Sequence, residues 1–223
     1  MLQAIVFDFD GVIADSEPLH LRAYQAVLGQ DGIDLTKEDY YKRYLGYDDM
    51  GLFQALTKDR KIAISTERMD SWVESKSEIL EEMLSSDSIL FPGAADCVRM
   101  CAGRYPLAIA SGALAPEIEL VLEHAGLRGH FKAIASASDG VRGKPAPDLY
   151  MLAMAKLRDV RMLEPNACIA IEDSHWGLES ARLAGLRTVA VTHTYPASEL
   201  RQADFTVDRL SDLTIPGLER LVR

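Results

Sequence analysis

FDFDGVIADSEPLH, residues 7–20, is the stretch that decides the fold. A short apolar run from Leu2 leads into it and ends at two carboxylates, Asp8 and Asp10. The run is too short for a helix and rich in β-branched and aromatic residues, which predicts a buried strand that ends where the aspartates begin. Side chains at positions i and i+2 lie on the same side of an extended chain, so the two anions repel each other unless a cation offsets the repulsion.

The composition is that of a soluble globular protein with a sizeable core. The chain has 223 residues, 48% of them hydrophobic, and 34 acidic against 24 basic side chains give a formal net charge of -10. This negative charge disfavours nucleic acid and anionic membrane surfaces as partners. The first apolar run is interrupted by Asp8 before it reaches signal-peptide length, and no later run approaches the roughly 20 residues of a membrane span. We therefore expect a cytoplasmic protein, and we expect it to be a monomer.

Short β-rich runs recur along the chain, and each is followed by a turn and a helical pattern. This alternation predicts an α/β fold, a doubly wound, Rossmann-like parallel sheet with helices on both faces. The predicted strands are Ala4 to Phe7, Leu107 to Ala110, Phe131 to Ala135, Cys168 to Ile171, Thr188 to Val191 and Phe205 to Val207.

One long segment, residues 16–88, shows no strand pattern. Its stretches LHLRAYQAVLGQ, TKEDYYKRYLG and STERMDSWVESKSEILEEML place apolar residues near the helical period of 3.6. We predict an all-helical cap domain over residues 16–88, inserted into a catalytic α/β core domain of residues 1–15 and 89–223.

Polar residues follow each of the central predicted strands, where ligands of open parallel sheets bind. They are Ser111-Gly112, Lys144 between a glycine and a proline, and the acidic pair Glu172-Asp173 before the candidate helix N-cap Ser174. Taken singly, these are an ordinary turn, a surface lysine and a charged helix N-terminus. Their conjunction with Asp8 and Asp10, all at strand carboxyl ends, indicates one site instead.

These motifs resemble those of a known family. DFDGVIADS, SG, GKPAPD and EDSHWGLESARLAG are similar to the four motifs of the haloacid dehalogenase superfamily, in the helical-cap branch near β-phosphoglucomutases and sugar-phosphate phosphatases. The resemblance spans nearly the whole chain, although the cap carries it only weakly.

The resemblance implies a role for each residue. Asp8 would be the nucleophile that forms an aspartyl-phosphate, and Asp10 the general acid and then base. Mg²⁺ would be held by Asp8, the backbone carbonyl of Asp10, Asp173 and Glu172. The phosphate and substrate would be bound by Gly11, Ser111, Gly112, Lys144, His20, Gly46 and Tyr47. Asp10 also favours a phosphate ester over a carbon–halogen bond, since a leaving halide needs no acid.

Three functions remain open at this point. A Mg²⁺-dependent phosphatase of a small phosphorylated metabolite, a sugar phosphate or phosphoglycolate-like compound, is favoured. A phosphosugar mutase like β-phosphoglucomutase is the alternative, and a catalytically silent binding protein is the third. Similar mutases carry a lysine before the cap glycine and an arginine after it, whereas this chain has Leu45 before Gly46. We expect Asp48 and Asp49 in the loop after this glycine, where they would repel a second phosphate, which favours hydrolysis. Lys42 and Arg43 are the nearest cations that could change this balance.

Overall fold

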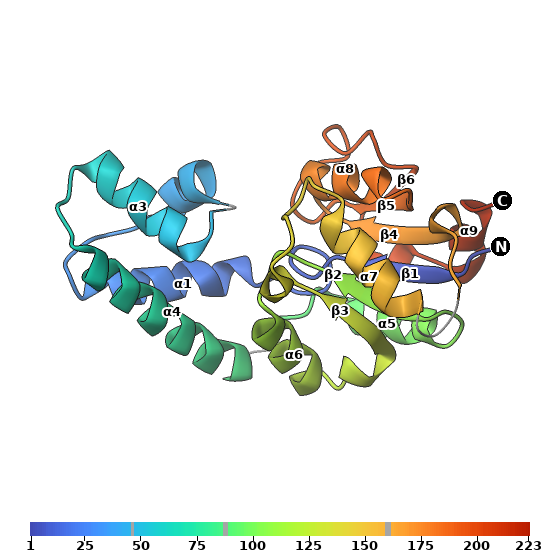
Figure 1. Ribbon diagram of the computed structural model, residues 1–223, viewed down its shortest axis with the longest axis horizontal. Coiled ribbons are helices and arrows are strands. Elements are labelled where there is room, and N and C mark those ends of the chain that lie inside the picture. The colour runs from blue at the N-terminus through green and yellow to red at the C-terminus, as the bar shows by residue number, and fades with distance from the viewer. Residues whose placement is uncertain (46, 87–88, 159–161) are drawn as a thin grey trace. The chain divides into compact units, whose positions relative to one another are not determined.

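A computed structural model describes residues 1–45, 47–86, 89–158 and 162–223 (Figure 1). Within these residues, six strands form one parallel sheet in the order β3-β2-β1-β4-β5-β6. Their bounds are β1 Ala4–Phe7, β2 Leu107–Ala110, β3 Phe131–Ala135, β4 Cys168–Glu172, β5 Arg187–Val191 and β6 Phe205–Val207. The predicted doubly wound α/β fold is thereby confirmed, and each strand lies within one residue of its predicted bounds.

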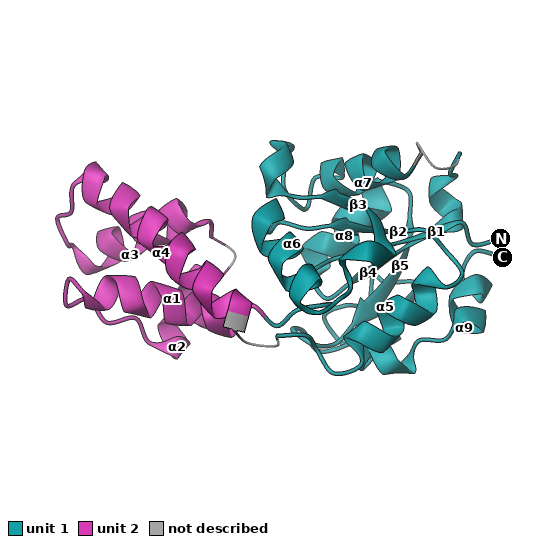
Figure 2. Cartoon of the chain, turned by 90° about the horizontal axis from the view of Figure 1, so that it is seen from below, with its two compact units in different colours: residues 1–15, 88–223 teal, residues 16–87 magenta. Residues whose placement is uncertain are grey.

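The chain divides into two compact units, which Figure 2 colours separately. The first comprises residues 1–15 and 88–223 and contains the sheet, and the second comprises residues 16–87. The predicted boundary between residues 88 and 89 adjoins residues 87 and 88, which lie outside the described residues.

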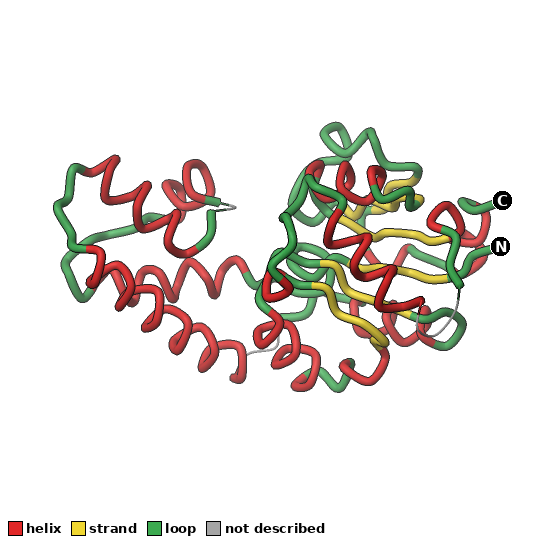
Figure 3. Tube along the Cα trace, in the orientation of Figure 1, coloured by secondary structure: helices red, strands yellow, loops and turns green. Residues whose placement is uncertain are grey.

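Helices cover both faces of the sheet in the first unit, as Figures 2 and 3 show. Helix α7 packs over β1, β2 and β3, and α8 packs over β4 and β5. Helix α5 lies on the opposite side of the sheet (Figure 2). The helices of this unit are α5 Ala94–Ala102, α6 Ala115–His124, α7 Asp148–Arg158, α8 His175–Leu183 and α9 Ile215–Arg220.

The second unit has helices in its described part and a hydrophobic core of its own. The helices are α1 Glu17–Gly29, α2 Lys37–Asp39, the π-helical turn η1 Tyr40–Tyr44, α3 Asp49–Arg60 and α4 Thr66–Ser86. The core includes Leu21, Tyr24 and Leu28 from α1, at helical spacing, together with Phe53 and Trp72. The start of α3 departs from expectation, because Asp48 caps this helix and Asp49 is its first residue, whereas we expected both acids in a loop.

The order of the strands determines where a ligand can bind. The chain runs outward from β1 to β2 and β3, and then returns to place β4 on the other side of β1. The connections on the two sides of β1 therefore leave the sheet in opposite directions, which opens a crevice at the carboxyl ends of β1 and β4. Asp8 follows β1 at this crevice, and Glu172 ends β4 there.

The sheet face under α7 is lined by small side chains. Ala4, Ala108, Ala110, Ala133, Ala135 and Ala170 are buried there, and Ala153 of α7 is fully buried against this face. Short side chains on both sides let the helix backbone approach the sheet closely. The interior has little spare volume at this contact, since protein cores are close-packed.

We predict that Ala153→Leu lowers the free energy of unfolding by about 1–3 kcal/mol, because the larger side chain forces α7 away from the sheet. The matched control is Ala155→Leu on the exposed side of the same helix, which should change it by less than about 0.5 kcal/mol. Urea unfolding of both variants measures the difference. Equal effects of the two substitutions would contradict the tight packing inferred here.

Candidate active site

Three buried carboxylates meet where β1 and β4 end. Oxygen atoms of Asp8, Glu172 and Asp173 all lie within 4.8 Å of one another. Asp8 is placed by the sheet itself, since its N–H donates to the carbonyl of Ile171 in β4 at 2.9 Å. Glu172 is fully buried, and Asp8 and Asp173 are 7% and 5% exposed. Such a group is stable only if cations neutralise it.

Lys144 supplies one of these cations. Its ammonium lies 2.8 Å from Oδ1 of Asp8 and 2.6 Å from Oε1 of Glu172. The lysine comes from the loop after β3, so it links the loops of three different strands. Burial by itself would lower the pKa of Lys144, but the Asp8 and Glu172 carboxylates outweigh it and raise the pKa above its usual value. Lys144 is therefore a permanently charged group that bridges Asp8 and Glu172.

Hydrogen bonds hold Glu172 in one orientation. The Tyr150 hydroxyl donates to Oε1 at 2.9 Å, while the backbone N–H of Asp173 and the hydroxyl of Ser174 donate to Oε2 at 3.1 and 3.2 Å. Ser174 also caps α8 by accepting from the N–H of Gly177, as predicted from the sequence. Glu172 thus has both oxygens engaged, and it acts as the buried support of the site.

The remaining charge on the cluster fits a divalent cation. Burial, then the Glu172 charge, raises the pKa of Asp8 well above its ordinary value. The same two causes, in the same order, raise the pKa of Asp173 to about 7. These shifts show that three carboxylates and one lysine leave uncompensated negative charge. Hard carboxylate oxygens are the donors that Mg²⁺ prefers, so the donor set fits this ion.

Gly11 has a steric reason to be glycine. Its φ is +76°, and a Cβ built at this position would lie 1.9 Å from Oδ2 of Asp173. Its N–H donates to the carbonyl of Ala14 at 2.9 Å, so this donor is already used within the loop. The close approach of Asp173 thus requires glycine at this position, and a phosphate contact of Gly11 stays a prediction.

Ser111 and Gly112 follow β2, the neighbour of β1 in the sheet. Ser111 is fully buried, and its oxygen accepts a hydrogen bond from the N–H of Ala113 at 3.0 Å. Within the part of the chain that the structure describes, this hydroxyl donates to no protein oxygen, and a phosphate oxygen would accept its proton. The structure thus brings this loop to the same edge of the sheet as Asp8. A phosphate contact for either residue stays a prediction.

The carboxylate of Asp10 is not one of the three clustered groups. Two roles are predicted for Asp10: its backbone carbonyl as a metal ligand and its carboxylate as the general acid. Both stay predictions. Tyr150 and Thr194 are two contacts of the site that the sequence motifs did not indicate. Thr194 lies near enough to the Asp173 carboxylate to lower its pKa, and it comes from the loop after β5, which carried no recognised motif.

His20 and Tyr47 belong to the helical unit, and Gly46 lies outside the described residues. His20 Nδ1 accepts a hydrogen bond from the Lys76 ammonium at 3.0 Å, so a neutral ring carries its proton on Nε2. Burial, then the Lys76 charge, lowers the pKa of His20 to about 3. Tyr47 is 52% exposed. Contacts of these residues with a substrate stay predictions.

Comparison with known proteins agrees with this geometry. Residues 2–185 match the haloacid dehalogenase-like hydrolase family, and the chain belongs to this family. The chain is therefore a hydrolase of the class that its motifs indicated.

Individual relatives are similar over most of their length. Fructose-1-phosphate phosphatase YqaB of Escherichia coli is 30% identical over 84% of this chain and 95% of its own. Protein CbbY of Rhodobacter capsulatus is 31% identical over 99% of both chains. The crystal structure of a CbbY mutant from Rhodobacter sphaeroides in complex with xylulose-(1,5)bisphosphate matches with a TM-score of 0.84. It is 27% identical, with 98% of this chain and 100% of that chain covered.

The raised pKa of Asp173 predicts how pH and Mg²⁺ act together. A carboxylate whose folded-state pKa is about 7, against an ordinary 3.8, destabilises the ion-free protein progressively as pH rises from about 4 through 7. A bound cation competes with the proton on this group. We therefore expect Mg²⁺ to raise the unfolding temperature more at pH 8 than at pH 5.5.

Thermal unfolding with and without Mg²⁺ at the two pH values measures this effect. Asp173→Asn is the control, and it should reduce the shift at pH 8. An equal Mg²⁺ effect at both pH values in the unmodified protein would show that protons and the cation do not compete here.

Proposed function

We propose that the chain is a Mg²⁺-dependent phosphatase that hydrolyses a small phosphorylated carbohydrate through an aspartyl-phosphate. The observation that carries the proposal is the buried group of Asp8, Glu172 and Asp173 with Lys144 between two of its members. YqaB, a relative over 84% of this chain, is named a fructose-1-phosphate phosphatase, which supports a sugar-phosphate substrate. The presence of Asp8 and all its partners argues against the catalytically silent alternative.

Each residue has a defined part in the proposed reaction. Asp8 attacks the phosphorus atom, and the bond from phosphorus to the substrate oxygen breaks while Asp10 donates a proton to that oxygen. Asp10 then removes a proton from the water that hydrolyses the aspartyl-phosphate and so regenerates Asp8. Lys144 and Ser111 stabilise the charge of the transferring group, since phosphoryl transfer depends mainly on positioning and electrostatics.

Asp8, Asp173, Glu172 and the backbone carbonyl of Asp10 would hold the ion in this proposal. When bound, Mg²⁺ would neutralise negative charge on the phosphate and on Asp8, which otherwise repel each other. Because Glu172 has both oxygens in hydrogen bonds, it would support the ligand set chiefly by fixing Lys144 and the loop of Asp173.

Asp8→Asn tests the nucleophile. The amide keeps the shape of the side chain but cannot form the acyl phosphate, so release of phosphate from p-nitrophenyl phosphate with Mg²⁺ should fall by about 10³-fold or more. The fold should persist, because the substitution removes one of three crowded negative charges while Lys144 keeps Glu172 as its partner. Asp96→Asn, at an exposed position on α5, is the matched control and should leave turnover unchanged. Substantial activity of purified Asp8→Asn protein would refute the aspartyl-phosphate.

The helical unit favours a substrate with one phosphate group. Its most deeply buried cation, Lys76, is 1% exposed and is paired at 2.8 Å with Asp49, which also accepts from the Tyr24 hydroxyl at 2.6 Å. Arg43, one of the cations that could have received a second phosphate, is paired with Asp59 at 2.8 Å. Neutral hydroxyl and imidazole groups suit a polyol better than a second dianion. We therefore propose that this unit selects the sugar end of a monophosphate.

A bisphosphate substrate is the second candidate, because the CbbY mutant matched above was crystallised with xylulose-(1,5)bisphosphate. We predict that fructose 1-phosphate or a hexitol phosphate is hydrolysed with a kcat/KM at least about tenfold above that for xylulose 1,5-bisphosphate, a difference of about 1.4 kcal/mol in transition-state binding. Phosphate release from the three compounds under equal Mg²⁺ measures the ratio. Preference for the bisphosphate would contradict the proposal that the helical unit selects the sugar end of a monophosphate.

The mutase alternative needs a separate assay. Supplied with β-glucose 1-phosphate and its bisphosphate, the enzyme should release phosphate faster than it forms glucose 6-phosphate. Faster mutase turnover would point to Lys42, the remaining cation near the cap glycine, as the second phosphate contact.

The location and state of assembly are also proposals. Across the described residues, no helix has the length and apolar character needed to span a bilayer. We propose a cytoplasmic monomer that acts on a small metabolite, and light scattering of the purified protein would test the state of assembly.

A further inference from the structure

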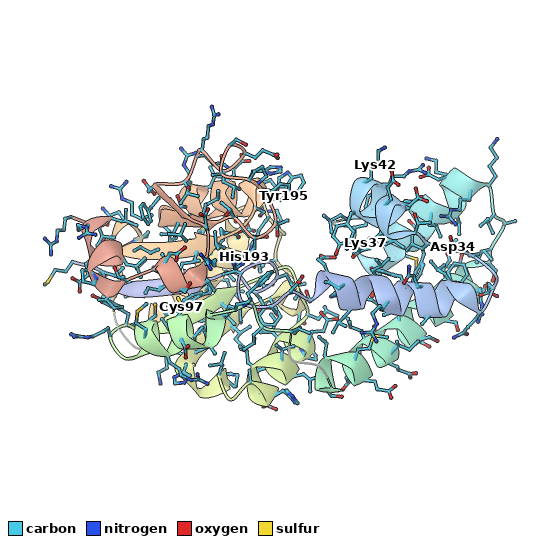
Figure 4. All side chains as sticks on the ribbon, turned by 180° about the vertical axis from the view of Figure 1, so that it is seen from behind. Asp34, Lys37, Lys42, Cys97, His193 and Tyr195 are labelled. Atoms are coloured by element: carbon cyan, nitrogen blue, oxygen red, sulfur yellow. The ribbon has the colours of Figure 1, made fainter. Side chains whose placement is uncertain are left out.

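The loop after β5 contacts the catalytic region although it carries none of the recognised motifs. It runs through Thr192, His193 and Thr194, and Figure 4 labels His193 and, two residues later, Tyr195. The loop is tied to the sheet at its start, where the N–H of Thr192 donates to the carbonyl of Val207 in β6 at 3.1 Å. The hydrogen bond of Thr192 to β6 therefore fixes the backbone position directly before His193.

His193 makes a polar contact with the loop that follows Asp8. Its Nδ1 lies 2.9 Å from the carbonyl oxygen of Gly11. A carbonyl oxygen only accepts hydrogen bonds, so Nδ1 must carry a proton and donate it. The acceptor belongs to Gly11, the residue directly after Asp10, and the Cα of Gly11 lies against the Asp173 carboxylate.

His193 also makes an apolar contact, with Phe91. The two rings are stacked, with centroids 4.0 Å apart and an angle of 18° between their planes. The N–H of Phe91 donates to the carbonyl of Ile13 at 3.0 Å, and Leu90 forms an antiparallel bridge with Ala14. One imidazole therefore contacts two segments of the sheet unit, through a hydrogen bond to Gly11 and a ring stack on Phe91.

The next residue reaches the metal-ligand side of the site. Thr194 lies near enough to the Asp173 carboxylate to lower its pKa, and Gly11 packs on the same carboxylate. His193 and Thr194, neighbours in the chain, thus lie next to Gly11 and Asp173. In the part of the chain that the structure describes, no other histidine donates a hydrogen bond to the loop of Gly11. His20 belongs to the helical unit, and none of the hydrogen bonds described for His124, His130 and His175 reaches the loop of Gly11.

We propose that His193 is a positioning residue that fixes the Gly11–Val12 peptide, one residue after Asp10, for catalysis by donating a hydrogen bond from Nδ1 to the Gly11 carbonyl. Its effect is indirect: it holds the backbone from which the general acid Asp10 projects and against which Asp173 packs. The inference about turnover rests on the proposed phosphatase function, whereas the hydrogen bond itself does not. Fixing such a peptide matters because small misplacements of an acid or ligand lower phosphoryl-transfer rates strongly.

Two variants separate the hydrogen bond from the ring stack. His193→Phe keeps the stack on Phe91 and loses the donor, whereas His193→Asn keeps an N–H donor at the place of Nδ1 and loses the stack. We expect His193→Phe to lower kcat about tenfold with KM changed less than about twofold, and His193→Asn to stay within about threefold of the unmodified kcat. His124→Phe, at an exposed position at the end of α6, is the control and should match the unmodified protein.

A measurement on the unmodified protein is independent of activity and of folding of the variants. The ¹⁵N shifts of the His193 ring at pH 8, above the ordinary histidine pKa of about 6.5, should show a protonated Nδ1 and an unprotonated Nε2. A ring protonated only on Nε2 would overturn the proposal, as would unmodified kcat in folded His193→Phe or an equal loss of kcat in His193→Asn.

Failure of the proposed function would be recognised separately. If the unmodified protein released no phosphate from any sugar phosphate tested, the midpoint Mg²⁺ concentration of the thermal shift would replace kcat as the readout. His193→Phe should then need more Mg²⁺ than His193→Asn, because Gly11 packs against Asp173. Equal midpoints would overturn the positioning role.

Discussion

The ammonium of Lys144, between Asp8 and Glu172, is the interaction on which the site depends. It lies within 2.8 Å of both carboxylates, in a region where all three groups are largely buried. Removing one partner of a buried ion pair costs about 3–5 kcal/mol, because the other charge is left without compensation. The site is therefore stable only when the loops after β1, β3 and β4 are all correctly formed, and this couples the chemistry to the whole sheet.

The three carboxylates carry more negative charge than the ammonium of Lys144 neutralises, and this excess favours binding of a cation. Asp8 and Asp173 have raised pKa values because burial and Glu172 disfavour their charged forms. A binding site that is unfavourable when empty gains stability from the ion that fills it. The same surplus would repel a phosphate dianion, so the phosphate and the divalent cation are expected to bind in mutual support.

The two units of the chain differ in how their buried charges are balanced. At the site of the sheet unit, the carboxylates of Asp8, Glu172 and Asp173 outnumber the ammonium of Lys144, and the imbalance suits a cation together with a phosphate group. In the helical unit, Lys76 and Asp49 neutralise each other and stand beside the His20 ring and the Tyr24 hydroxyl. Each unit has a hydrophobic core of its own, so the proposed reaction chemistry and the proposed substrate selection would be carried by separately packed parts of the chain.

The sequence by itself determined the strands, the helical segment and the residues that gather at the sheet edge. Strands of three to five mostly apolar residues followed by charged or small polar residues are local patterns, and parallel strands necessarily bring their carboxyl ends together. Only the tertiary structure showed that the close approach of Asp173 requires glycine at position 11 and that the Tyr150 hydroxyl donates to Glu172. It also showed that the loop with His193 and Thr194 lies next to the site. It also showed that Asp49 begins a helix and pairs with Lys76, 27 positions further along the chain. These features depend on contacts between residues distant in sequence, and no spacing or periodicity within one segment encodes such contacts.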